Sequence, residues 1–209
     1  MITDPIPRKA SYREEFVRSD QLAALVVPAN DRLKAIAERI EAAMKREATD
    51  AYEAPKQIPR RLGNASLGMT GASAAFLSAA SSFYKVREPG ISVLAARPLR
   101  ARESGWTMEL FGDYAPDRMF IRVWMRTAVL KRVTSFGTFF STLCHEFCHH
   151  LDMQRFGFTR SPHTRGFYAR AAALYHHARG TPMRPLVWRR IGRERWMIDW
   201  RAMRAGRRW

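Results

Sequence analysis

Apolar residues recur at three- and four-residue steps in several stretches of the chain, a pattern that predicts amphipathic helices. One helix is expected from Tyr12 to Val27, where Pro28 would stop it. A second is expected to begin at Asn30 or Asp31. Its apolar face comprises Leu33, Ile36, Ala37, Ile40, Ala43 and Met44. The two helices predict an N-terminal packing layer with a charged, solvated outer face.

Residues 54 to 71 interrupt this pattern with two prolines and three glycines, so a loop or linker is expected there. A helix of small residues is expected from Ala72 to Tyr84. Beyond Gly90 the pattern changes to short runs with strand composition. These runs are Ile91–Ala95, Trp106–Phe111 and Met119–Met125. Gly112–Asp117 would form a turn between the last two, and the whole predicts an α+β fold with a small antiparallel sheet.

A further helical pattern follows the predicted strands. Its apolar stripe, which is expected to be buried, comprises Phe139, Phe140, Leu143, Phe147 and Leu151. Ser135 or Thr138 can cap the start of this helix. Gly157 suits the left-handed position just past its end.

The same helix carries His145-Glu146-Phe147-Cys148-His149, an HExxH pattern. Residues four apart lie about 40° apart around a helix axis, so the two histidines share one face. Neutral imidazoles on one face suit zinc, which prefers such ligands at about 2 Å in a tetrahedral array. Glu146 lies about 100° round from His145, where its carboxylate can accept a proton from water beside the metal.

A zinc site of this kind needs a third protein ligand. Asp152 shares the histidine face, but it lies about 10.5 Å along the axis from His145, too far to share one ion. It is expected to be a supporting or surface carboxylate. Arg155 stands where the compact HExxHxxGxxH pattern has its last histidine, which excludes that class of site.

His163 is the better candidate for the third ligand. Ser161 and Pro162 predict the N-cap and first residue of a new helix, with His163 in its first turn. Gly180 is expected to end that helix. The loop before it is short enough to fold the second helix back and return His163 towards the metal.

Other polar residues around the motif have simpler explanations. His150 points about 100° away from the preceding histidine and should lie outside the ligand shell. His176 and His177 are expected to be a solvated pair at a helix end. Cys144 and Cys148 lie four apart on one helix, which fits a disulfide poorly, so both are expected to be reduced and packed.

The stretch from Ser141 to Phe167 resembles the SprT-like family of zinc metallopeptidases, which includes the bacterial SprT proteins and the Spartan proteases. The shared features are HEFCH, a linker with Arg155-Phe156-Gly157 and Ser161-Pro162, and His163 followed four residues later by an aromatic residue. The resemblance extends over roughly residues 85 to 180. Two features depart from the family: Thr164 replaces a frequent glycine, and no cysteine-rich module follows.

The resemblance implies that His145, His149 and His163 hold zinc and that Glu146 is the general base. It also implies a small gluzincin-like fold and, in the Spartan branch, cleavage of proteins attached to DNA. The chain would then divide into three parts. They are an N-terminal helical layer and linker (1–84), a metallopeptidase core (85–180) and an Arg/Trp-rich C-terminal helix (181–209).

The formal net charge is +17, and most of the excess lies near the C-terminus. Residues 155–209 contain 14 arginines, no lysine and two acidic residues, a net +12. Pro185 can open a last helix containing Trp188, Trp196 and Trp200. Interleaved arginine and tryptophan suit phosphates and stacked bases. A plain solvated basic surface and an anionic membrane surface are the other interpretations.

The sequence therefore predicts a zinc metallopeptidase that acts on peptides or proteins, and the resemblance together with the basic C-terminal segment extends this expectation to proteins held on DNA. An edge strand beside the zinc helix would let an extended peptide bind as an added strand. The alternative is a basic nucleic-acid-binding protein whose metal site is structural or inactive. The first residues lack an apolar signal segment, no run approaches 18 uncharged apolar residues, and both cysteines suit a reducing compartment, so the cytoplasm is expected.

Overall fold

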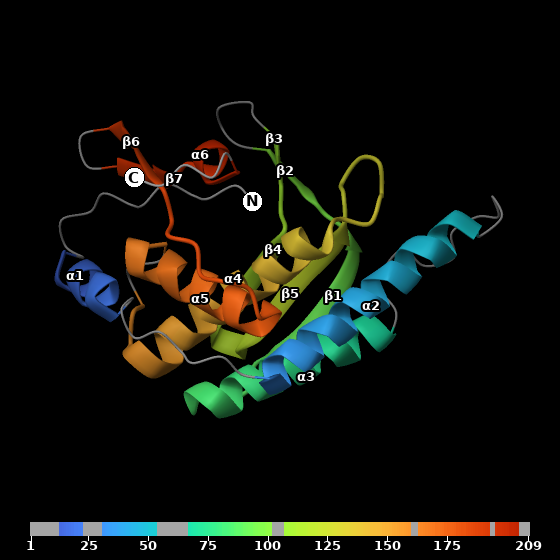
Figure 1. Ribbon diagram of the computed structural model, residues 1–209, viewed down its shortest axis with the longest axis horizontal. Coiled ribbons are helices and arrows are strands. Elements are labelled where there is room, and N and C mark those ends of the chain that lie inside the picture. The colour runs from blue at the N-terminus through green and yellow to red at the C-terminus, as the bar shows by residue number, and fades with distance from the viewer. Residues whose placement is uncertain are drawn as a thin grey trace.

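The computed structural model combines helices with one small sheet and two hairpins, which confirms the α+β class (Figure 1). It describes residues 13–22, 31–53, 67–101, 107–159, 163–192 and 195–204. The predicted Tyr12–Val27 helix corresponds to α1 (Arg13–Leu22), and residues 23–30 lie outside the described part.

The central sheet is mixed, so the prediction of an antiparallel sheet is wrong. Its strand order is β1 (Gly90–Ala96), β5 (Phe120–Arg126) and β4 (Gly112–Ala115). β1 and β5 run parallel, whereas β4 pairs antiparallel with β5 at the edge. Alternation along a strand reveals which side chains share a face but carries no information about strand direction. The long connection from β1 to β5 supplies the crossover that a parallel pair requires.

That connection holds a second, two-stranded hairpin. β2 (Leu99–Ala101) pairs antiparallel with β3 (Thr107–Glu109). The predicted strand Trp106–Phe111 is therefore shorter, and Trp106 lies outside the described part. The predicted turn Gly112–Asp117 is instead strand β4 followed by the 3-10 turn Pro116–Arg118.

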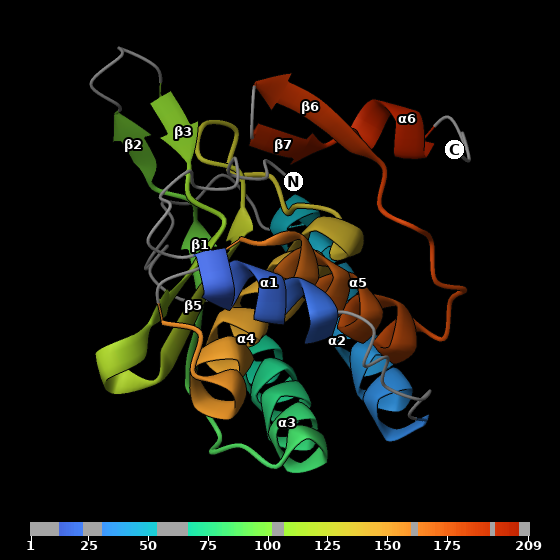
Figure 2. The ribbon, with the colours of Figure 1, turned by 90° about the vertical axis from the view of Figure 1, so that its left-hand side faces the viewer.

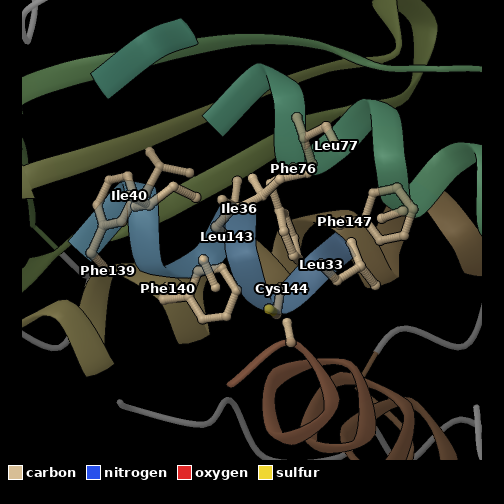
Figure 3. Close-up of a cluster of buried hydrophobic side chains, with 14 of the residues drawn as sticks. Leu33, Ile36, Ile40, Phe76, Leu77, Phe139, Phe140, Leu143, Cys144 and Phe147 are labelled. Carbon is tan, nitrogen blue, oxygen red and sulfur yellow. The ribbon is translucent and has the colours of Figure 1, made fainter. Parts of the chain in front are cut away.

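Three helices supply most of the side chains that pack with the sheet in the core, and Leu174 and Ala178 of a later helix complete the cluster. α2 (Asp31–Glu53) and α3 (Leu67–Tyr84) pack on each other, and α3 and α4 (Phe136–Phe156) contact the sheet. Figure 3 shows side chains of all three helices meeting in one buried cluster. The labelled members are Leu33, Ile36, Ile40, Phe76, Leu77, Phe139, Phe140, Leu143, Cys144 and Phe147. The predicted stripes of α2 and α4 are thus confirmed as core.

α3 begins five residues before the predicted start at Ala72, so Gly68 and Gly71 are helical rather than part of a loop. Glycine weakens a helix by about 1 kcal/mol relative to alanine. Burial of Met69 in the core offsets part of that cost. Tertiary packing therefore overrides the local propensity at this end of α3.

The ends of α4 and α5 (Arg165–Arg179) are set by caps. Ser135 caps α4 by accepting a hydrogen bond from the Thr138 N–H at 3.2 Å, and Gly157 ends it with φ 68°, both as predicted. α5, however, is capped by Thr164 and not by Ser161, which lies outside the described part. His163 therefore precedes the helix instead of lying in its first turn.

The prediction of one C-terminal helix from Pro185 is wrong. The segment forms the hairpin β6 (Trp188–Gly192) and β7 (Arg195–Ile198), followed by the short helix α6 (Trp200–Arg204). Four-residue spacing of tryptophans fitted a helix, but the hairpin buries Ile198 against the Phe167 side of α5. None of the helices described is both long enough and apolar enough to cross a membrane.

Candidate metal centre

Three histidines bring their Nε2 atoms together between α4 and the segment that enters α5. The Nε2 atoms of His145 and His149 are 3.2 Å apart. Nε2 of His163 lies 3.1 Å from that of His145 and 3.0 Å from that of His149. The structure thus brings together the three histidines that the sequence singled out, in an arrangement that could hold a metal ion.

The shape of this histidine triangle fits a cation better than a hydrogen-bonded cluster. An imidazole nitrogen either carries a hydrogen or presents one lone pair, so no Nε2 can donate to one neighbour and accept from the other. Nitrogen ligands at about 2.0–2.1 Å from a tetrahedral ion lie about 3.4 Å apart, close to the observed spacing. Three lone pairs facing one point repel each other unless a positive charge lies between them.

The surroundings keep the rings of His145 and His149 in the neutral form that binds metals. Burial lowers the pKa of His145 to about 3, with a smaller contribution from His163, and burial lowers the pKa of His149 well below its usual value. The ring of Phe167 lies against all three histidines, with centroid distances of 4.5–5.3 Å. Tyr168 stacks on His163 at 5.8 Å.

Glu146 projects from the same helix into the wall of the site and is only 6% exposed. Burial raises its pKa to about 8, and the nearby Asp113 carboxylate adds to the rise. A metal cation held by the three histidines would lower this pKa again, because an adjacent positive charge favours the carboxylate form that can accept a proton. Glu146 is not part of the histidine triangle.

A cleft of about 430 Å³ opens over the triangle and Glu146. α4 forms one wall, and the segment from Met108 to Tyr114, which includes edge strand β4, forms the other. Much of the rest of the cleft lining is apolar. It includes Met108, Leu110, Phe111, Met153 and Phe158. The cleft therefore offers a strand edge and apolar surface beside the candidate metal ligands.

Gly112 of β4 lies close against α4. A Cβ atom there would lie 2.7 Å from Cγ2 of Thr142 and 2.8 Å from Oε1 of Glu146. Gly112→Ala should therefore lower the free energy of unfolding by about 1–3 kcal/mol, because the wall of the site must move apart. Urea unfolding of the two proteins measures the difference.

Gly71→Ala is the matched control for this substitution. It lies in α3, and a Cβ at Gly71 meets no atom within 4 Å. Alanine there should raise stability by up to about 1 kcal/mol. Equal effects at Gly112 and Gly71 would show that β4 and α4 can separate without cost.

The other candidates around the motif have different partners. Asp152 also lines the cleft, but its carboxylate accepts two hydrogen bonds from Arg170, at 2.9 and 2.6 Å. His150 donates from Nε2 to the Arg87 carbonyl and accepts at Nδ1 from Tyr114, so it lies outside the ligand set as predicted. Both cysteines are buried and free, also as predicted.

Three residues close to the motif in the sequence carry donors that could stabilise a developing oxyanion: Tyr168, Arg165 and His150. His150 uses both ring nitrogens elsewhere, and Arg165 forms an exposed ion pair with Asp20 at 3.3 Å. Tyr168 is the one of the three whose ring contacts the histidine triangle.

Sequence reasoning missed the support that the N-terminal helix gives this centre. Ser19 and Asp20 of α1 contact Thr164, Gly166 and Arg170 next to the third histidine. These contacts join residues about 145 positions apart in the chain. No local pattern in the sequence could have predicted these contacts. The one signal was Thr164, which stands where the SprT-like family often has glycine and which bonds Ser19 in the structure.

Comparisons with known proteins give no match: no family model, no curated protein and no solved structure matches this chain. The resemblance to SprT-like metallopeptidases therefore depends on the HExxH motif, the spacing to the third histidine and the geometry of the centre.

Proposed function

We propose that this chain is a zinc metallopeptidase of SprT-like type. The observation that carries the proposal is the triangle of three Nε2 atoms, 3.0–3.2 Å apart, with the Glu146 carboxyl group beside it in the wall of a cleft. Metallopeptidases need this combination, in which three protein ligands leave one position of the ion open to the reactants.

In this proposal His145, His149 and His163 hold zinc. The ion would polarise the scissile carbonyl and make water a stronger nucleophile at neutral pH. The Glu146 carboxylate accepts the proton of the attacking water and then delivers it to the nitrogen of the leaving amine. Its buried position keeps the group next to the reacting atoms and away from bulk solvent.

The proposed substrate is an extended stretch of protein. β4 lies at the edge of the sheet and lines the cleft, so a peptide can bind there as an additional strand. The apolar lining favours bulky apolar side chains on that peptide. The shape of the cleft thus supports the peptidase interpretation over a small polar substrate.

The first test is the metal content of purified wild type and His163→Ala, measured by mass spectrometry. Wild type should carry about one zinc per chain, because three neutral imidazoles complete a tetrahedral site. His163→Ala should lose most of it, because two ligands from one helix turn hold zinc weakly. Circular dichroism should show the helices intact.

His176→Ala is the matched control. This histidine lies outside the triangle, with Nδ1 bonded to Thr181 at 2.8 Å, so its removal should leave the zinc content unchanged. Wild-type protein that binds no zinc when supplied with it would contradict the proposed function. Zinc retained equally by His163→Ala would contradict the proposed ligand set.

A second candidate is a basic nucleic-acid-binding protein whose metal site is structural or inactive. It is favoured by exposed arginines on the C-terminal hairpin and α6, which include Arg189, Arg190 and Arg201, and by the half-buried Trp188 that precedes the first two in the chain. The same residues are the basis for extending the peptidase proposal to proteins held on DNA. In that case DNA should raise the rate of cleavage, and salt should reduce the effect. The division into three parts and the cytoplasmic location stay predictions.

A further inference from the structure

The third histidine is held in an unusual backbone conformation. His163 has φ 60°, in the left-handed region that residues other than glycine rarely adopt. Such conformations persist where the surrounding structure fixes them, and they are common at binding sites. What fixes His163 is therefore part of the metal centre.

The residue that follows is tied directly to the N-terminal helix. Thr164 caps α5 by accepting a hydrogen bond from the Phe167 N–H at 3.0 Å. Its hydroxyl also shares a hydrogen bond of 2.6 Å with the hydroxyl of Ser19 in α1. Both Ser19 and Thr164 are fully buried, so this bond is not weakened by water.

α1 lies against α5 (Figure 2), and side chains of each helix pair with backbone groups of the other. The last carbonyls of a helix and its first N–H groups lack partners within that helix. Arg170 of α5 donates to the Ser19 carbonyl near the end of α1 at 2.7 Å. Asp20 of α1 accepts from the Gly166 N–H in the first turn of α5 at 2.7 Å. The carboxylate of Asp20 also suits the positive end of the α5 dipole.

The contact is too close for any residue but glycine at position 166. A Cβ atom there would collide with the Ser19 carbonyl group and lie 2.8 Å from the Asp20 nitrogen. The backbones of the two helices thus meet directly, three residues after the third histidine. Movement of α1 must therefore move the first turn of α5.

We propose that Ser19 and Asp20 are positioning residues for the third metal ligand. Through Thr164 and Gly166 they fix the entry into α5 and thereby hold His163 in its left-handed conformation. α1 precedes the predicted metallopeptidase core by some 60 residues of chain, and in this proposal it helps to position a ligand of the metal centre. The inference rests on the metal site of the proposed function but not on peptidase activity.

The test is zinc affinity, measured by competition with a chromophoric chelator on full-length protein that is folded before zinc is added. Asp20→Ala should weaken zinc binding about 10-fold, in the range seen when groups supporting a ligand are removed. Asp20→Asn keeps an oxygen that can accept from Gly166 and should recover most of the affinity. Glu41→Ala removes a partly exposed carboxylate on α2, far in sequence from the α1–α5 contact, and should change nothing.

A second pair of variants covers the case in which Asp20→Ala does not fold. Thr164→Val keeps the side-chain shape but removes the hydroxyl, which both bonds Ser19 and caps α5, whereas Thr164→Ser keeps the hydroxyl. Zinc affinity should fall about 10-fold in the valine variant and stay near wild type in the serine variant.

The outcomes separate this inference from the proposed function. A purely structural role would lower the free energy of unfolding without changing the zinc affinity of the folded state. Wild-type affinity in folded Asp20→Ala, or in folded Thr164→Val, would therefore overturn the inference. The wild type could instead bind zinc tightly, with weaker binding in these variants, and still cleave no peptide. That result would contradict the proposed peptidase activity but would support the positioning role.

Discussion

Glu146→Gln should reduce peptide hydrolysis by about 10³-fold, the range expected when a general base is removed. The amide has nearly the same size, so it fits between α4 and Gly112 without new contacts. It cannot take a proton from water at neutral pH, and that step is the one assigned to this side chain. Zinc content should stay at the wild-type value, because Glu146 is outside the histidine triangle. Initial rates on a mixed peptide library, measured beside metal analysis, give both quantities.

Glu41→Gln makes the same chemical change at a partly exposed position of α2, outside the cleft, and should leave the rate unchanged. The result also separates the two candidate functions. A nucleic-acid-binding protein with a structural metal site would keep its function in Glu146→Gln and lose it when the exposed arginines of β6 are replaced. Peptidase activity that survives in Glu146→Gln would show that Glu146 is not the general base.

The parts of the centre that the sequence predicts are those set by local geometry. His145 and His149 share a face because they are four residues apart on a helix, and the cap at Ser135 and the Gly157 end fix where that helix lies. His163 is linked to them by a short loop, which limits how far it can be. The spacing of the three histidines along the chain is therefore sufficient to predict that they lie together.

The parts that the sequence does not predict depend on contacts between distant segments. The hydrogen bonds of Ser19 to Arg170 join residues 151 positions apart, and nothing near either residue indicates its partner. The parallel pairing of β1 with β5 depends on the crossover between them and not on the composition of either strand. The C-terminal hairpin replaced the expected helix because packing of Ile198 on α5 outweighs the helical spacing of the tryptophans.

Arg170→Met should lower the free energy of unfolding by about 3–5 kcal/mol, because it leaves the Asp152 carboxylate buried without its partner. Asp152 is 4% exposed and Arg170 is 5% exposed, and two hydrogen bonds of 2.9 and 2.6 Å join them. Burial raises the pKa of Asp152, and the guanidinium of Arg170 opposes that rise. The substitution also removes the donors to Ser19. Urea unfolding in the presence of a chelator measures the loss without a contribution from bound metal.

The double variant Asp152→Leu/Arg170→Met should lose less stability than the two single variants added together, because no unpaired charge is left in the interior. Additive losses would show that the ion pair is not the source of the effect. Glu41→Ala breaks an exposed pair with Lys45 and should cost about 0.5 kcal/mol or less. If Arg170→Met cost no more than that exposed pair, α1, α4 and α5 would not depend on this buried ion pair. The support for His163 would then have to come from the Ser19–Thr164 and Asp20–Gly166 bonds alone.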